Sequence, residues 1–290
     1  MSKFIILMAI CLLTACSKIN ENVVVPNDNQ QIVEENTQEN NDDTVKNEEK
    51  QEVNNEPTDY DLTNLSNKKI SWYFTKGKEH AKPTISSDLK EVADKYDAIY
   101  LEESDDKVIY LTFDEGYENG YTAQILDTLK EYNVKAVFFI TGPYLNKEEA
   151  LVRRMVEEGH IVGNHTVNHP SMPEVTDNEK LEKELLDLDR KFYDLFGVSM
   201  KYVRPPKGEF SERTLALSKN LGYTSVFWSF AYKDWETNNQ KGTDYAANTV
   251  INGLHPGEVM LLHAVSKDNA NALPIIIEKA REMGYEFGEL

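Results

Sequence analysis

Cysteine is nearly absent from this chain. The two cysteines, Cys11 and Cys16, lie in the first twenty residues, so the rest of the sequence can form no disulfide and must be stabilised by its core. A surplus of basic residues is also missing, since the net charge over 290 residues is −19. Such a charge repels phosphates, which argues against nucleic acid as a partner.

The first apolar run, residues 4–13, is too short for a comfortable bilayer span. It follows Lys3 and leads into Leu13-Thr14-Ala15-Cys16, which resembles a bacterial lipobox, whose cysteine becomes the lipidated first residue. We therefore expect residues 1–16 to be a lipoprotein signal peptide, and Cys16 to anchor the protein to the outer side of the bacterial cell membrane. An ordinary signal peptide and an uncleaved anchor are the alternatives, and both would also export the chain.

Residues 17–60 lack glycine and contain one aromatic residue, Tyr60, at their far end. Between residues 21 and 60, twelve acidic residues stand against Lys46 and Lys50, which gives this stretch a charge of −10 and leaves −11 for residues 61–290. A segment with so little apolar surface cannot offset the entropy lost on ordering. We expect residues 17–60 to be a disordered acidic linker that holds a folded domain clear of the membrane.

Ordered sequence resumes near residues 70–74, and a helix is expected over residues 88–96 with Ser86 or Ser87 as its cap. This stretch offers no group of chemically reactive residues. We expect residues 61–106 to be an extension that packs on the domain that follows.

From Lys107 onward, apolar strands alternate with amphipathic helices. Strands are expected at residues 108–113, 136–140, 160–163, 201–204, 223–229, 258–262 and 285–287. Helices are expected near residues 121–132, 147–158, 177–196, 211–221, 243–253 and 270–283. This alternation predicts an α/β domain over residues 107–290 with a parallel sheet, either closed into a barrel or open.

Two adjacent carboxylates, Asp114 and Glu115, follow the strand expected at 108–113. Acidic residues at the carboxyl end of a strand commonly serve catalysis. Because like charges push the proton affinities of the two groups apart, we expect a cation to neutralise one of them. A solvated acidic turn before Gly116 is the alternative.

Two histidines spaced four residues apart, His165 and His169, follow the strand expected at 160–163. On a helical turn they would face the same way and, with a carboxylate, could hold a catalytic divalent metal with an open coordination position. A bare pair of this kind is a weak signal. The signal is stronger because the pair lies at a strand end in the same series of alternating strands and helices as Asp114 and Glu115.

Three further strand ends carry polar residues. Arg204 could fix a carboxylate or form a surface ion pair. Trp235, beside Asp234, could stack on a sugar ring or pack in the core. His263 could be a general acid or a hydrogen-bonded core residue.

Taken in order, these segments resemble the five motifs of the polysaccharide deacetylase family, the NodB-like carbohydrate esterases. The five segments are Thr112–Gly116, His165–His169, Arg204–Pro206, Asp234–Trp235 and Leu261–His263. The resemblance covers about residues 107–290. Shorter stretches are similar to the branch of the family that deacetylates N-acetylmuramic acid in peptidoglycan, a step toward the muramic δ-lactam of spore cortex. These stretches are residues 118–122, 204–208, 238–242 and 262–270.

The resemblance implies a distorted (β/α) barrel and a role for each motif residue. The ligands of a divalent metal, with zinc first among the candidates, would be Glu115, His165 and His169. Asp114 would be the general base, oriented by Arg204. His263 would be the general acid, with its charge fixed by Asp234. The substrate pocket would be lined by Pro205, Trp235 and Leu261.

Three residues depart from the pattern of the broad family. Glu115 stands in place of an aspartate, which lengthens the expected ligand by one methylene. Lys207 stands where many members have a tyrosine, and Ala231 replaces the first aspartate of the fourth motif.

The sequence therefore predicts a monomeric, metal-dependent peptidoglycan N-acetylmuramic acid deacetylase, attached to the membrane by lipid and acting on glycan strands. One alternative is a deacetylase of peptidoglycan N-acetylglucosamine or of another polysaccharide. A noncatalytic cell-wall-binding lipoprotein is another, although Asp114 and His263 argue against it. A solute-binding lipoprotein would have two lobes and no metal triad. A role in sporulation is implied by analogy alone.

Overall fold

A computed structural model describes residues 59–290. The predicted signal peptide, Cys16 and nearly all of the predicted linker lie outside the described residues. The main feature of the described part is a seven-stranded sheet in the order β7-β5-β4-β3-β2-β8, with β9 paired to β2, and every pairing is parallel. Its strands are β2 (Val108–Glu115), β3 (Val137–Ile140), β4 (Ile161–Asn164), β5 (Tyr202–Val203), β7 (Thr224–Ser225), β8 (Glu258–His263) and β9 (Glu286–Gly288).

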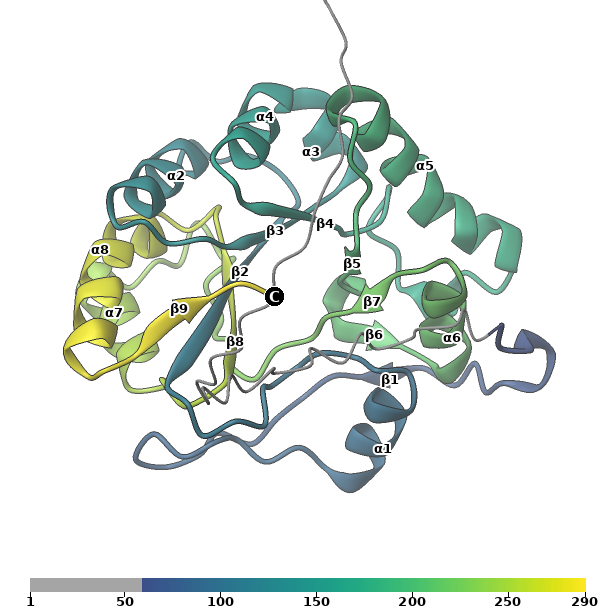
Figure 1. Cartoon of the computed structure of the whole chain (residues 1–290), viewed down its shortest axis with the longest axis horizontal. Coiled ribbons are helices and arrows are strands. Elements are labelled where there is room, and N and C mark those ends of the chain that lie inside the picture. Colours follow the sequence, from purple (N-terminus) through teal and green to yellow (C-terminus); the bar gives the residue numbers. More distant parts are fainter. Residues whose placement is uncertain (1–58) are drawn as a thin grey trace, which may run out of the picture. The chain divides into compact units, whose positions relative to one another are not determined.

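The sheet curls until its two edges meet. After β7, Val226 bridges Ile99, and Phe230 then bridges Met260 of β8, so that the chain returns to the other edge of the sheet. In Figure 1 the strands lie in the middle and the helices lie around them. The predicted distorted (β/α) barrel is confirmed, and it is closed by isolated bridges instead of a continuous ladder.

The helices of this domain follow the predicted alternation. They are α2 (Thr122–Glu131), α3 (Gly142–Lys147), α4 (Glu149–Glu157), α5 (Asn178–Phe196), α6 (Glu212–Asn220), α7 (Thr243–Ile251) and α8 (Lys267–Glu282). Helix α3 was not predicted, although its start carries a signal: the Thr141 hydroxyl accepts from the Tyr144 amide, and a proline lies in the first turn. None of the helices in the described part of the chain is long and apolar enough to cross a membrane.

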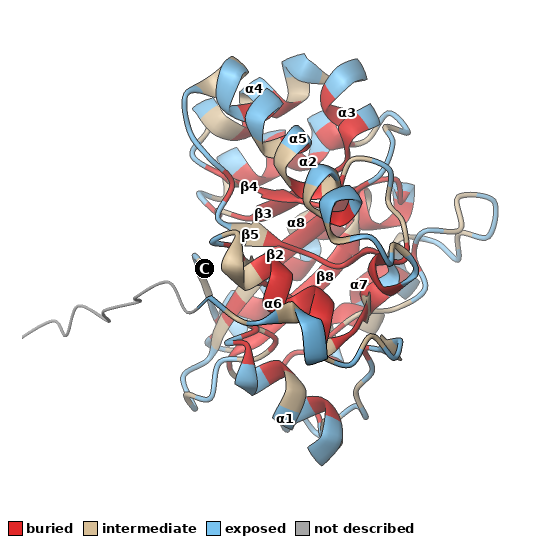
Figure 2. Ribbon diagram, turned by 90° about the vertical axis from the view of Figure 1, so that its right-hand side faces the viewer, coloured by how far each residue is buried: buried red, intermediate tan, exposed pale blue. Residues whose placement is uncertain are grey.

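Strand alternation divides the core into two layers. Phe113, Phe138 and Leu262 face outward and pack under the helices. Phe139 and Val259 face the barrel interior in a smaller cluster. Figure 2 shows the buried residues concentrated along the strands and on the inner sides of the helices.

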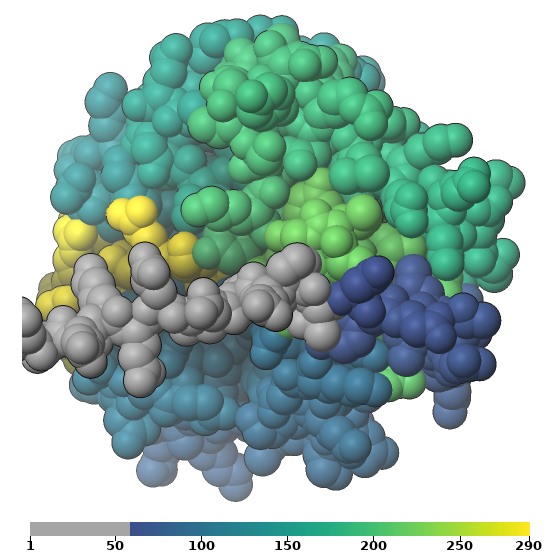
Figure 3. All heavy atoms as spheres, turned by 45° about the vertical axis from the view of Figure 1, so that its right-hand side comes forward, coloured from purple at the N-terminus to yellow at the C-terminus, as the bar shows by residue number. Residues whose placement is uncertain are grey.

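The residues before β2 pack against the barrel. Strand β1 (Ile70–Ser71) pairs antiparallel with β6 (Glu209–Phe210), and α1 (Ser87–Lys95) lies in the same cluster of buried residues. Trp72 stacks on Phe227 with ring centroids 4.5 Å apart, and its indole nitrogen donates to the Trp228 carbonyl at 2.8 Å. In Figure 3 these residues, in purple and blue, cover the lower part of the molecular face.

Candidate active site

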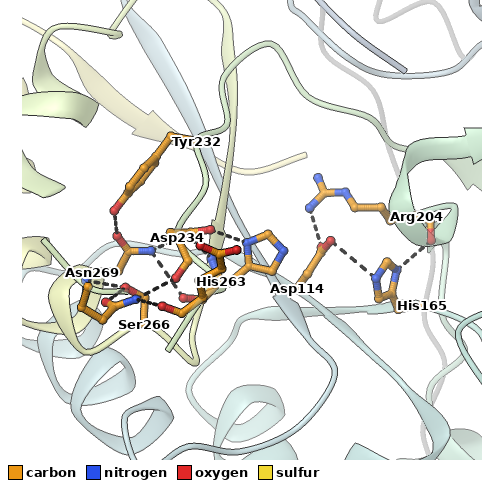
Figure 4. A network of polar contacts seen from close by, with 10 residues as sticks. Asp114, His165, Arg204, Tyr232, Asp234, His263, Ser266 and Asn269 are labelled. Atoms are coloured by element: carbon orange, nitrogen blue, oxygen red, sulfur yellow. Dashed lines mark hydrogen bonds and ion pairs between the residues drawn. The ribbon is translucent and has the colours of Figure 1, made fainter. Parts of the chain in front are cut away.

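Asp114 lies at the carboxyl end of β2, inside the barrel. The Nη1 atom of Arg204 donates to its Oδ1 at 2.8 Å, and the Nε2 atom of His165 lies 3.5 Å from its Oδ2 (Figure 4). Burial alone would raise the pKa of Asp114, but the charge and hydrogen bond of Arg204 and the charge of His263 outweigh it and hold the pKa below its ordinary value of 3.8. Asp114 is therefore ionised at neutral pH.

Arg204 is completely buried, so it is no surface ion pair. Of the three guanidinium nitrogens, Nη1 donates to Asp114. The Nε atom donates to the Val226 carbonyl at 3.2 Å, and Nη2 donates to the Phe227 carbonyl at 3.3 Å. The guanidinium lies 4.2 Å from the centroid of the Phe139 ring, which is an attractive cation–π distance.

Gly163 makes room for the Phe139 ring. The two residues are paired in register on β4 and β3, and a Cβ atom on Gly163 would lie 2.6 Å from Cδ1 of that ring. A side chain there would push the ring against Arg204. The glycine therefore belongs to the support of the Arg204–Asp114 pair.

The two histidines of the second motif are brought together by a loop, not by the helical turn that their spacing predicts. Thr166 and His169 both adopt left-handed backbone conformations, with φ of 65° and 55°. The Thr166 hydroxyl accepts from the His169 amide at 2.9 Å. As a result, the rings of His165 and His169 meet edge to face with centroids 4.8 Å apart.

Helix α5 fixes this loop from outside. The Glu184 carboxylate accepts from both the backbone amide and the side-chain amide of Asn168, each at 2.7 Å. The Asn164 side chain accepts from the Thr166 amide at 2.8 Å. Glu184 has no signal in the sequence near the histidines, because this contact joins residues 16 positions apart.

The lone pairs at His165 and Asp114 are arranged so that they could bind a cation. Its Nδ1 atom lies 2.8 Å from the Arg204 carbonyl, which can only accept, so Nδ1 carries the proton. Burial lowers the pKa of His165 and that of His169, the latter to about 4, so both rings are neutral. The free lone pair on Nε2 of His165 thus faces the Asp114 carboxylate. A cation between these two acceptors would satisfy both.

Glu115 does not join this group, which differs from the predicted ligand set. Strand β2 continues two residues beyond its predicted end, so Asp114 and Glu115 are successive strand residues and face opposite sides. Glu115 points to the helices, where Oε1 accepts from the Thr122 hydroxyl at 3.4 Å and Oε2 is buried without a partner. Burial, and then the nearby Glu118, raise its pKa well above 4.5. Within residues 59–290, no three His, Cys, Asp or Glu side chains are grouped as a metal site.

His263 and Asp234 form a second charged pair beside Asp114. In the ladder between β2 and β8, His263 is directly in register with Asp114. Asp234 Oδ1 lies 2.7 Å from Nδ1 of His263, and Asp234 Oδ2 accepts from the His263 amide at 2.8 Å. Burial alone would lower the pKa of His263, but the charge and hydrogen bond of Asp234 raise it above 6.5.

Comparison with known proteins agrees with this arrangement. The model of the polysaccharide deacetylase family matches residues 102–226. Over 227 residues, the chain is 50% identical to an uncharacterised 30.6 kDa protein of Geobacillus stearothermophilus. The matched region covers 78% of this chain and 85% of that protein. It is 44% identical over 224 residues to the peptidoglycan-N-acetylmuramic acid deacetylase PdaA of Bacillus subtilis, covering 77% of this chain and 85% of PdaA. The chain belongs to the polysaccharide deacetylase family.

Other family members show how far the similarity extends. The solved structure of PdaA, a family 4 carbohydrate esterase, superposes with a TM-score of 0.76 at 43% identity, covering 78% of this chain and 96% of that one. A peptidoglycan-N-acetylglucosamine deacetylase of Bacillus cereus is 33% identical over 189 residues, covering 63% of this chain and 86% of that protein. The family predicted from the five motifs is confirmed, as is its similarity to the N-acetylmuramic acid branch.

The predicted substrate-binding residues of this polysaccharide deacetylase lie around the two charged pairs. Trp235 is 49% exposed, and its ring centroid lies 5.3 Å from that of His263. Leu261 is two residues before His263 on β8, so it faces the same side of the sheet. Pro205 is buried directly after Arg204. The structure thus brings all three near the site, with Trp235 as the exposed member.

A hydrogen-bond network behind Asp234 had not been predicted. Asn269 Nδ2 donates to Asp234 Oδ2 at 2.5 Å, and Asn269 Oδ1 accepts from the Tyr232 hydroxyl (Figure 4). Gln240 donates to the Asp234 carbonyl at 3.1 Å and accepts from the Ser266 hydroxyl at 2.7 Å. The signature over residues 262–270 includes Asn269, so the sequence held a signal for it, but no spacing rule joins it to Asp234.

Proposed function

We propose that this chain removes the acetyl group from N-acetylmuramic acid in peptidoglycan glycan strands, a step toward muramic δ-lactam. One observation carries the proposal: an ionised carboxylate, Asp114, and a histidine with a raised pKa, His263, lie in register on neighbouring strands. Amide hydrolysis needs this combination, because a base must activate water and an acid must protonate a poor leaving group.

The two pairs divide the proton transfers. Asp114 takes a proton from the attacking water, while the charge of Arg204 keeps Asp114 ionised and the hydrogen bond holds it in place. The water oxygen bonds to the acetyl carbon and the C–N bond breaks. His263, held in its charged form by Asp234, gives its proton to the departing sugar nitrogen. The products are acetate and the free amine.

A divalent metal ion, with zinc first among the candidates, would be held by His165 and His169. Asp114 Oδ2 lies 3.5 Å from Nε2 of His165. When bound, the ion would act as a Lewis acid on the amide carbonyl and on water. Glu115 faces away from both imidazoles, so this proposal replaces it as a ligand.

We also propose that the chain is divided into four segments. Residues 1–16 would direct export and Cys16 would carry the lipid, which places the enzyme outside the cytoplasmic membrane. Residues 17–60 would be the acidic linker, residues 61–106 the packing extension and residues 107–290 the catalytic domain. The enzyme would act on the cell wall as a monomer, with sporulation as the expected setting.

The test is an acetate-release assay with the purified protein on amidase-treated peptidoglycan, on intact peptidoglycan and on N-acetylglucosamine oligomers. We expect acetate from muramic acid, with lactam or free muramic amine visible by mass spectrometry. Acetate from N-acetylglucosamine oligomers alone would favour the activity named for the Bacillus cereus relative. An Asp114→Asn variant as active as the wild type would overturn the mechanism.

A further inference from the structure

Lys207 is an exposed lysine in an unusual backbone conformation at the rim of the site. It lies three residues after Arg204, with φ of 60° and ψ of 8°. The left-handed region is open to glycine, whereas a residue with a Cβ atom is strained there. Such an outlier persists only where the surrounding structure enforces it.

The backbone is fixed on both sides of Lys207. Two buried prolines precede it, and the Gly208 amide donates to the Pro205 carbonyl at 3.0 Å. Beyond it, the Gly208 carbonyl accepts from the Trp72 amide at 2.8 Å, and the next two residues form β6, which pairs with β1. The N-terminal extension therefore holds the turn that presents Lys207.

The ammonium group of Lys207 has no acidic partner in the described part of the chain. No carboxylate within residues 59–290 lies within 4.0 Å of it, and the neighbouring Glu209 is paired with Lys69 at 3.4 Å. Three residues before Lys207, the Arg204 carbonyl lies 2.8 Å from Nδ1 of His165. A lysine without an acidic partner in residues 59–290 thus lies in the turn that directly follows the residue holding His165.

We propose that the Lys207 ammonium binds the lactyl carboxylate of N-acetylmuramic acid and so selects this sugar. The inference rests on the proposed function and names the residue that would set its specificity. Muramic acid differs from glucosamine by a lactyl ether, whose carboxyl group is anionic when free and is a neutral amide when it carries a peptide. A cation held by a rigid turn distinguishes the free lactyl carboxylate from the lactyl amide and from glucosamine, which has no lactyl group.

The test couples a change in the protein to a change in the substrate. Wild type, Lys207→Met and Lys207→Arg are compared on amidase-treated glycan strands and on the same strands after the lactyl carboxyl has been converted to its methylamide. We expect wild type and Lys207→Arg to lose about three- to tenfold in kcat/KM on the methylamide, mainly through KM. Lys207→Met should treat the two substrates alike.

Lys130→Met is the matched control, because Lys130 is an exposed lysine at the far end of α2. It should keep the wild-type ratio between the two substrates. If Lys207→Met also keeps that ratio while wild type still deacetylates muramic acid, the inference is wrong and the proposed function stands. If wild type releases acetate from N-acetylglucosamine oligomers only, both fall together.

Discussion

At the scale of single residues, the fate of the two adjacent acids depends on the direction of their side chains. Asp114 faces Arg204 and His165 inside the barrel, and Glu115 faces Thr122 under the helices. Burial would raise the pKa of both carboxylates, but the charge of Arg204 outweighs it at Asp114, whereas the nearby Glu118 adds to it at Glu115. The pKa of Asp114 is therefore lowered and that of Glu115 is raised.

The proposed metal ligands are tested by comparing zinc binding of a Glu115 variant with that of a His169 variant. We expect Glu115→Gln to bind zinc as the wild type does, since its side chain faces away from both imidazoles. His169→Ala, which removes a proposed ligand, should weaken zinc binding at least about tenfold. Equilibrium dialysis with metal analysis measures both. Equal loss of zinc in the two variants would restore Glu115 to the ligand set.

The pH dependence of activity should reflect the two charged pairs. Catalysis needs Asp114 ionised and His263 protonated, so kcat/KM should fall as pH rises through the raised pKa of His263, above 6.5, and fall in acid only below 3.8. Asp234→Asn removes the carboxylate that raises the pKa of His263. Its alkaline limb should therefore move to lower pH, and an unmoved limb would show that His263 is not the acid.

At the scale of elements, β3 and β4 support the site through one close approach. Gly163→Ala should force the Phe139 ring to move, at a cost of about 1–3 kcal/mol in the free energy of unfolding, and should lower kcat by displacing Arg204. Gly116→Ala is the control, since a Cβ atom there meets nothing within 4 Å. Urea unfolding and steady-state kinetics measure both effects. A Gly163→Ala variant with native stability would contradict this account of the packing.

The two residues after strand β1 (Ile70–Ser71), Trp72 and Tyr73, are neighbouring aromatic residues that allow a second test. Trp72 is 6% exposed and Tyr73 is 56% exposed. Trp72→Ala should lower the free energy of unfolding by about 3–5 kcal/mol, because it empties the space against Phe227 and Phe210. Tyr73→Ala should change it by no more than about 0.5 kcal/mol. Similar values for the two would mean that the extension is not part of the folded unit.

The parts of the fold that the sequence predicts are those with local signals. Strands β2, β3, β4 and β8 were predictable because each is an apolar run that ends at a polar group. Helix α3 was missed because it is too short to show periodicity, and the histidine loop because left-handed residues leave no spacing pattern. Glu115 was misplaced because its strand was expected to end at residue 113. The roles of Glu184 and Asn269 depend on contacts that only the folded chain creates.

At the scale of the whole molecule, the five motifs suggest a domain that starts at Lys107, but the folded unit is larger. Phe210 and Phe227, both fully buried, are covered by the residues before β2. We expect a fragment of residues 107–290 to melt at a lower temperature than residues 59–290, or to aggregate, because these rings become exposed. Differential scanning calorimetry of the two fragments decides the point. Equal melting temperatures would show that the extension adds no stability.

The register between β2 and β8 has a consequence for engineering. Asp114 and His263 are opposite each other in a ladder of main-chain hydrogen bonds, and neighbouring strands lie about 4.8 Å apart whatever their side chains. The separation of base and acid is thus a property of the backbone. We therefore expect substitutions of Trp235 or Lys207 to change which acetylated sugar is accepted while the spacing of Asp114 and His263 is kept.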